Sequence, residues 1–94
     1  MNKQTTISIV VRGPIARPDV SGLCDHVSEL LEMSGASIAL CDVRRVEPGA
    51  VSVDALARIR LVAREHGCDV KVHGPSDDLR SLIALMGLQE VLLG

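Results

Sequence analysis

The chain has 94 residues, a formal net charge of −2 and 47% hydrophobic residues, and it contains no Phe, Tyr or Trp. This length suits a single domain over residues 1–94, with a core built from aliphatic side chains. The lack of aromatic rings excludes base stacking and aromatic cation cages, and the acidic charge balance argues against a nucleic-acid partner. No apolar run approaches the roughly 20 residues that span a bilayer, so we expect a cytoplasmic protein without membrane insertion.

The first half of the chain predicts a strand, a helix and a second strand. Residues 7–11 are mainly β-branched and precede a Gly-Pro turn, which is typical of a strand. Pro18 suits the first turn of a helix, and Gly35 is a natural stop. Residues 36–43 form a short, mostly apolar run, which predicts a strand buried on both faces. The apolar stripe of the intervening helix consists of Val20, Leu23, Val27, Leu30 and Leu31.

The second half begins with another predicted helix and strand. Ser52 is predicted to cap a helix that ends at Gly67. Helical spacing places Leu56 and Ile59 on its apolar side, so we expect both in the core. Residues 70–72 alternate between valine and lysine, which predicts a third strand.

The last residues complete an alternating pattern. Ser76 is a predicted cap for a third helix, which stops at Gly87, and residues 91–93 predict a short last strand. Such alternation implies right-handed crossovers between parallel strands. The predicted fold is therefore α/β, with a mostly parallel sheet of about four strands flanked by three helices.

The cysteines and histidines form no recognised catalytic or metal-binding motif. No Cys-x-x-Cys pair occurs, and no histidine stands at a zinc-finger spacing. We therefore expect no metal, no cofactor and no enzymatic centre. Each cysteine lies in or beside an apolar stretch and is expected to be a small buried side chain: Cys24, Cys41 and Cys68. The histidines are expected on the solvated surface: His26, His66 and His73.

Two polar residues stand where functional sites often form. Asp42 lies near the carboxyl end of the second predicted strand, and crevices in open α/β sheets form at that edge. Ser52 is placed at a helix N-terminus, where backbone N–H groups favour an anion, so a phosphate on its hydroxyl would be tolerated. An ordinary helix cap is the simpler explanation of Ser52, and a turn residue is the simpler explanation of Asp42.

Leu61 is the other candidate for function. On a helical wheel it falls beside charged residues rather than with the core, and it continues a line through Val53 and Ala57. A single surface leucine often has no special role, but a line of three can form a strip that binds a partner. The predicted partner-binding surface comprises Ser52, Val53, Asp54, Ala57 and Leu61.

Several segments together resemble the STAS domain, a family named for sulfate transporters and anti-sigma factor antagonists. Residues 7–17 resemble its opening strand with a glycine-containing turn, and residues 38–43 resemble its central strand ending in aspartate. Residues 53–67 resemble the helix that follows. Residues 79–88 resemble a later helix that runs into a Gly-Leu step. The resemblance covers nearly the whole chain and implies a STAS-like fold.

The chain departs from the family at the phosphorylation motif. Many members carry Asp-Ser-Ser-Gly before the second helix, and an anti-sigma factor kinase phosphorylates the second serine. That motif aligns with Ala50-Val51-Ser52-Val53, which makes Ser52 the candidate phosphoacceptor but removes the flanking aspartate and glycine. The last helix of the family also has no counterpart before Gly94.

The resemblance implies a non-enzymatic module that works by docking a protein. The leading hypothesis is an anti-sigma factor antagonist in a partner-switching pathway, whose partner is an anti-sigma factor kinase. The alternative is a STAS-like accessory subunit that binds a transporter ATPase without phosphorylation. A kinase-dependent change in the mass of Ser52 would distinguish the two.

Overall fold

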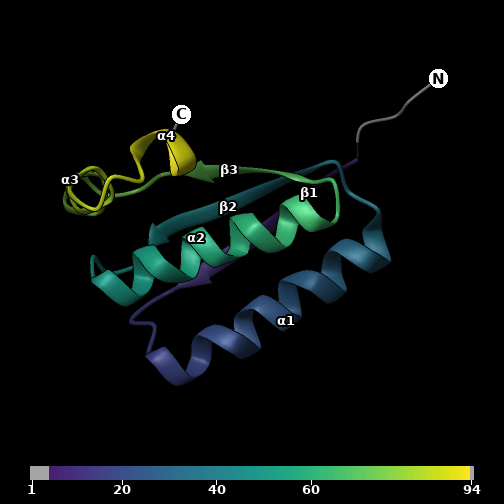
Figure 1. Cartoon of the computed structure of the whole chain (residues 1–94), viewed down its shortest axis with the longest axis horizontal. Helices are drawn as coiled ribbons and strands as arrows, with labels where there is room; N and C mark the ends of the chain where they lie inside the picture. Colours follow the sequence, from purple (N-terminus) through teal and green to yellow (C-terminus); the bar gives the residue numbers. More distant parts are fainter. Residues whose placement is uncertain (1–4, 94) are drawn as a thin grey trace.

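A computed structural model of the chain describes residues 5–93. Parallel strands and helices alternate along it, as Figure 1 shows. The last two helices are short and follow the third strand. The elements are β1 (Thr6–Arg12), α1 (Arg17–Ser34), β2 (Ile38–Arg45), α2 (Ala50–Glu65), β3 (Asp69–His73), α3 (Asp77–Leu85) and α4 (Gln89–Leu92).

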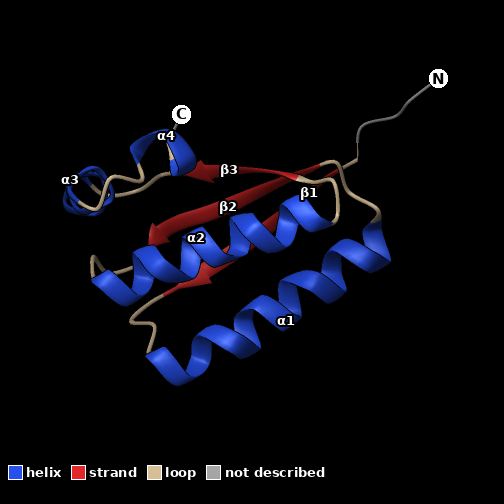
Figure 2. Ribbon diagram, viewed as in Figure 1, coloured by secondary structure: helices blue, strands red, loops and turns tan. Residues whose placement is uncertain are grey.

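The sheet has three parallel strands in the order β1-β2-β3. Cys41 sits at its centre, opposite Ile9 of β1 and Val72 of β3. Each crossover helix therefore leads to the next strand in the same direction. Right-handed crossovers that step in one direction place their helices on one face, and α1 and α2 lie side by side there (Figure 2).

Only one face of the sheet is covered by helices among the described residues. The inward side chains of β2 are fully buried, whereas Leu40 on the outward face is 38% exposed. On β1, Val10 is 56% exposed between the buried Ile9 and Val11. The prediction that the second strand is buried on both faces was therefore wrong. A short apolar run does not reveal that both helices will pack on the same side.

The core lies between the sheet and the helices. Leu56 and Ile59 of α2 are almost completely buried within it, as their helical spacing predicted. Leu79 and Ile83 of α3 extend the core past β3, because they lie four residues apart on one side of that helix. The predicted α/β class with a parallel sheet is confirmed.

Two of the three predicted helix caps are present in the structure. Gly35 adopts a left-handed conformation, and its N–H donates to the Leu31 carbonyl, as expected of a C-cap. The Ser76 hydroxyl accepts from the Leu79 N–H at 3.1 Å, which confirms it as an N-cap. The cap predicted at Ser52 was wrong, because α2 begins two residues earlier and its N-cap is Gly49.

The end of the described chain is a helix rather than the predicted strand. Leu88 and Leu92 are four residues apart, and the short helix α4 lets both pack against the core. Helix α4 also contacts α2, α3 and β3. The described residues therefore form three strands and four helices, in place of the predicted four strands and three helices.

Candidate functional site

Ser52 lies in the first turn of α2, as its third residue. The residue is only 4% exposed. The first backbone bond of the helix joins the Val53 N–H to the Gly49 carbonyl at 3.1 Å, so the three preceding N–H groups lie ahead of the hydrogen-bonded ladder. A phosphate on Ser52 would lie near these donors, but a kinase would first have to reach a residue that is largely buried.

Only part of the partner-binding strip predicted along α2 is exposed to solvent. Val53 is fully buried in the core, so it cannot contact a partner, and its assignment to the strip was wrong. Ala57 is half-buried, and Leu61 is 60% exposed, on the polar side of the helix where its spacing placed it. The line of three residues tilts from the core to the surface, because an α-helix has 3.6 residues per turn.

Ala57 and Leu61 form one wall of a groove between α2 and α4. Leu88 and Val91 form the opposite wall, and the groove has a volume of about 270 Å³. Arg60 and Arg64 line it from α2. We call this feature the α2–α4 groove, and it consists of Ala57, Arg60, Leu61, Arg64, Leu88 and Val91. Sequence reasoning missed the α4 wall because it assigned residues 91–93 to a strand.

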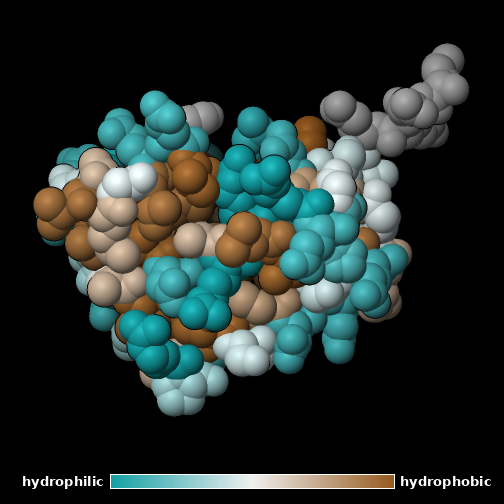
Figure 3. Space-filling model, in the orientation of Figure 1, coloured by the Kyte–Doolittle hydropathy of each residue, from teal (hydrophilic) through white to brown (hydrophobic). Residues whose placement is uncertain are grey.

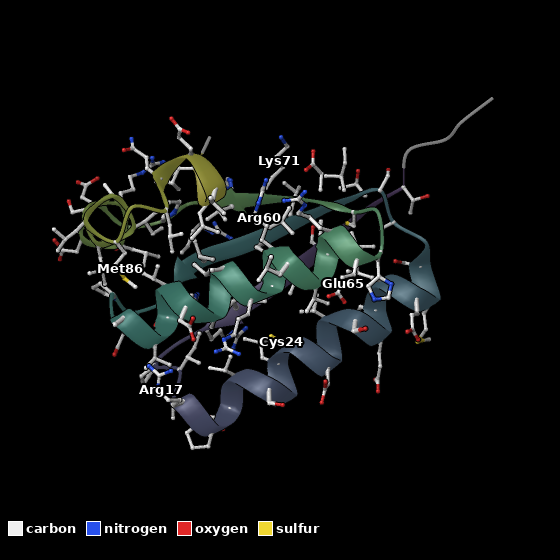
Figure 4. All side chains as sticks on the ribbon, viewed as in Figure 1. Arg17, Cys24, Arg60, Glu65, Lys71 and Met86 are labelled. Atoms are coloured by element: carbon white, nitrogen blue, oxygen red, sulfur yellow. The ribbon has the colours of Figure 1, made fainter. Side chains whose placement is uncertain are left out.

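Asp54 connects the two long helices through arginine side chains. Its Oδ2 accepts a hydrogen bond from Arg58 Nε on the same helix at 3.0 Å and lies 3.7 Å from Arg17 Nη1 of α1. These three residues line a second groove of about 460 Å³ between α1 and α2, together with Cys24 and Leu61. Leu61 lines both grooves and therefore forms a ridge between them. Figure 4 shows Cys24 on α1, on the side that faces α2.

Asp42 lies on the other side of the sheet from α2. Its neighbours Cys41 and Val43 point into the core, so the Asp42 side chain faces outward. It forms two hydrogen bonds with the Arg44 guanidinium, at 2.7 and 3.0 Å, and accepts a third from the Arg44 backbone N–H at 3.1 Å. These bonds lower the pKa of Asp42 to about 2. Asp42 and Ser52 therefore belong to different surfaces.

The cysteines and histidines are dispersed. Cys41 and Cys68 are buried, and burial raises the pKa of Cys41 to about 11, whereas Cys24 is only half-buried. His26 and His73 are exposed, and His66 is half-buried with its Nε2 3.0 Å from the Ser28 hydroxyl. Within residues 5–93, no three His, Cys, Asp or Glu side chains are grouped so that they could hold a metal ion. No helix in the same range has the length and apolar character needed to cross a membrane.

The comparison with solved structures finds the same fold in another protein. The chain is similar to the crystal structure of a sulfate transporter family protein from Wolinella succinogenes, with a TM-score of 0.68 and 22% sequence identity. The match covers 93% of this chain and 70% of that one. No protein-family model and no curated protein matches the sequence. The structural likeness supports the STAS-like fold that the sequence resemblance implied.

Proposed function

We propose that this chain is a non-enzymatic, cytoplasmic module that docks a protein partner through the exposed side of α2. The observation that carries the proposal is Leu61, which is 60% exposed on a ridge between two grooves. Figure 3 shows apolar surface gathered over α3, α4 and the adjoining part of α2, between hydrophilic areas. Contiguous exposed apolar surface with a polar border is typical of protein-binding sites.

Two kinds of partner are consistent with a STAS-like module. In the first, the chain is an anti-sigma factor antagonist, its partner is an anti-sigma factor kinase, and phosphorylation of Ser52 releases the complex. In the second, the chain is an accessory subunit that stays bound to a transporter ATPase. The burial of Ser52 favours the second, because a kinase needs the hydroxyl in its active site.

Affinity measurements with purified proteins test the docking proposal. The partners are the anti-sigma factor kinase or transporter ATPase encoded nearest to the gene of this chain. We expect one of them to bind the wild type and to bind Leu61→Asp at least about tenfold more weakly, because a buried charge at the centre of the interface should cost more than the ~1.4 kcal/mol that corresponds to a factor of ten. Met33→Asp is the matched control, because Met33 is 87% exposed on α1 and lines neither groove beside α2. Equal binding of wild type and Leu61→Asp would show that the docking proposal is wrong.

Mass spectrometry separates the two kinds of partner. The chain is incubated with the kinase and ATP, and the tryptic peptide that contains Ser52 is analysed. A phosphate on Ser52, together with weaker binding of the phosphorylated chain, supports the antagonist. An unmodified Ser52 in a chain that still binds its partner supports the accessory subunit.

A further inference from the structure

The arginines of the chain fall into two groups by their ion pairs. Arg17 and Arg58 share Asp54, and Arg44 pairs with Asp42. Arg60 and Arg64, which line the α2–α4 groove, form no ion pair with any described residue of 5–93. The two charged residues that line the groove are therefore both positive, and neither has an ion-pair partner among the described residues.

The residues that α2 contributes to the groove form two parallel rows. Arg60 and Arg64 are four residues apart and form one row along α2, while Ala57 and Leu61 form the adjacent row with the same spacing. Lys71 of β3 shares a neighbouring hollow with Arg60 (Figure 4), but it does not line the α2–α4 groove. Asp69 and Glu90 also line that hollow, but neither lines the α2–α4 groove itself.

We propose that the α2–α4 groove binds an amphipathic helix of the partner protein, with carboxylates along the border of its apolar stripe. This inference rests on the proposed docking function and names the chemistry of the partner. Leucine-sized side chains of that helix would contact Leu61 and Val91, and its Asp or Glu side chains would pair with Arg60 and Arg64. A groove between two helices with apolar walls suits a third helix, which enters it with side chains spaced three and four residues apart.

A second copy of this chain is a poor occupant of the groove. Its longest helix, α1, carries the acidic residues Asp25, Glu29 and Glu32 on its exposed side. The apolar stripe of α1, however, is already packed against the core, and Met33 is its one large hydrophobic residue that is largely exposed. A second copy would therefore supply the charge without the apolar contact.

Two synthetic helical peptides test the inference. Both span about four turns, the length of α2, and carry the same leucine stripe, which is flanked by Glu in one peptide and by Lys in the other. Each is titrated into the isotope-labelled full chain and followed by NMR. We expect the Glu peptide to bind about tenfold more tightly than the Lys peptide, since it pairs with two arginines. We also expect its largest shift changes at Ala57, Leu61, Leu88 and Val91.

Charge reversal provides the decisive comparison. The double variant Arg60→Glu/Arg64→Glu should reverse the preference between the two peptides, whereas Arg45→Glu, at an exposed arginine beyond the groove, should leave it unchanged. Circular dichroism checks that each variant is folded. Equal binding of the two peptides, an unchanged preference in the double variant, or shift changes confined to the open face of the sheet would overturn the inference. So would a dimer of the chain that Leu61→Asp dissociates and Met33→Asp does not.

The same double variant separates this inference from the docking proposal. If the protein partner binds the double variant as tightly as the wild type but binds Leu61→Asp weakly, docking through α2 stands and the acidic helix is excluded. If the partner binds Leu61→Asp as tightly as the wild type, docking through this surface fails as well.

Discussion

Gly74 lies directly against the Arg44 side chain, so that a Cβ atom on Gly74 would overlap Arg44 Cγ. Gly74 follows β3 and has a φ of +71°, a backbone conformation that glycine adopts without strain. The space above it is filled by the arginine that pairs with Asp42. One glycine after β3 therefore determines where the ion pair on β2 can lie.

Gly74→Ala should destabilise the fold and raise the pKa of Asp42. The new methyl group displaces Arg44, and the positive φ costs about 1–2 kcal/mol in addition. Without Arg44, the pKa of Asp42 should rise from about 2 toward the ordinary 3.8. An NMR titration of the Asp42 carboxyl measures this change. Gly67→Ala is the control, because Gly67 has a φ of +68° with nothing within 4 Å. Gly67→Ala should lose stability, but the pKa of Asp42 should not change in it. Equal Asp42 pKa values in Gly74→Ala and Gly67→Ala would contradict the argument.

Leu56→Ala should lower the free energy of unfolding by about 2–5 kcal/mol. Leu56 is 1% exposed, and its loss leaves a cavity between α2 and the sheet. Urea denaturation followed by circular dichroism provides the measurement, since the chain has no tryptophan or tyrosine fluorescence. An unchanged midpoint would mean that the register of α2 is wrong.

Leu61→Asp should change the free energy of unfolding by less than about 1 kcal/mol. The side chain is mostly in solvent, where a polar replacement is tolerated. The same denaturation experiment checks this, with Leu56→Asp as the buried counterpart on the same helix. A loss comparable to that of the buried variant would show that Leu61 supports the core, and its use as a probe of docking would end.

Ser52 should respond differently to alanine and to aspartate. Ser52 is not the cap of α2, so Ser52→Ala should cost less than about 1 kcal/mol. Ser52→Asp places a charge at a residue that is 4% exposed, and we expect it to cost about 1–3 kcal/mol, reduced by the favourable end of the helix dipole. Thermal denaturation of the two variants gives the comparison. A larger loss for alanine would restore a capping role to the hydroxyl.

Alkaline pH should destabilise the chain through Cys41. Burial raises the pKa of its thiol to about 11 from the ordinary value of 9.0, so the folded state keeps a proton that the unfolded state releases. The stabilisation is complete below about pH 9 and falls as the pH rises toward 11, by about 2–3 kcal/mol in total. Urea midpoints across this range, measured under reducing conditions, test the prediction. Cys41→Ala should be less stable than the wild type at neutral pH, but its free energy of unfolding should fall less between neutral and high pH. Parallel pH profiles of the wild type and the variant would contradict this prediction.

Local patterns predicted the helices that have an apolar stripe and a clear stop. The stripe from Val20 to Leu31 and the left-handed Gly35 together mark α1, because burial and the end of the helix are both encoded within one segment. The exposure of Leu61 was predictable for the same reason. Its angle on the helix follows from its distance in sequence to Leu56 and Ile59, which are buried.

Features that depend on distant packing could not be predicted in this way. Ser52 is a common capping residue, but the extended Gly49 begins the helix earlier, and nothing local distinguishes the two starts. The run at residues 91–93 looked like a strand, and it forms a helix because Leu88 and Leu92 must both reach the core. The second wall of the α2–α4 groove is formed by α4, so it could not be predicted once residues 91–93 were assigned to a strand.

The order β1-β2-β3 also has a consequence for how the chain can fold during synthesis. Each strand pairs with the strand made just before it, so the β1-α1-β2 unit contains all its own sheet partners once Arg45 has left the ribosome. Helix α2 and β3 can then add to an existing edge, without waiting for a later segment. A circularly permuted chain that starts at α1 and ends with β1 could form the same sheet, with the strand order β1-β2-β3. It would nevertheless have to hold the edge of β2 open until the last strand arrived.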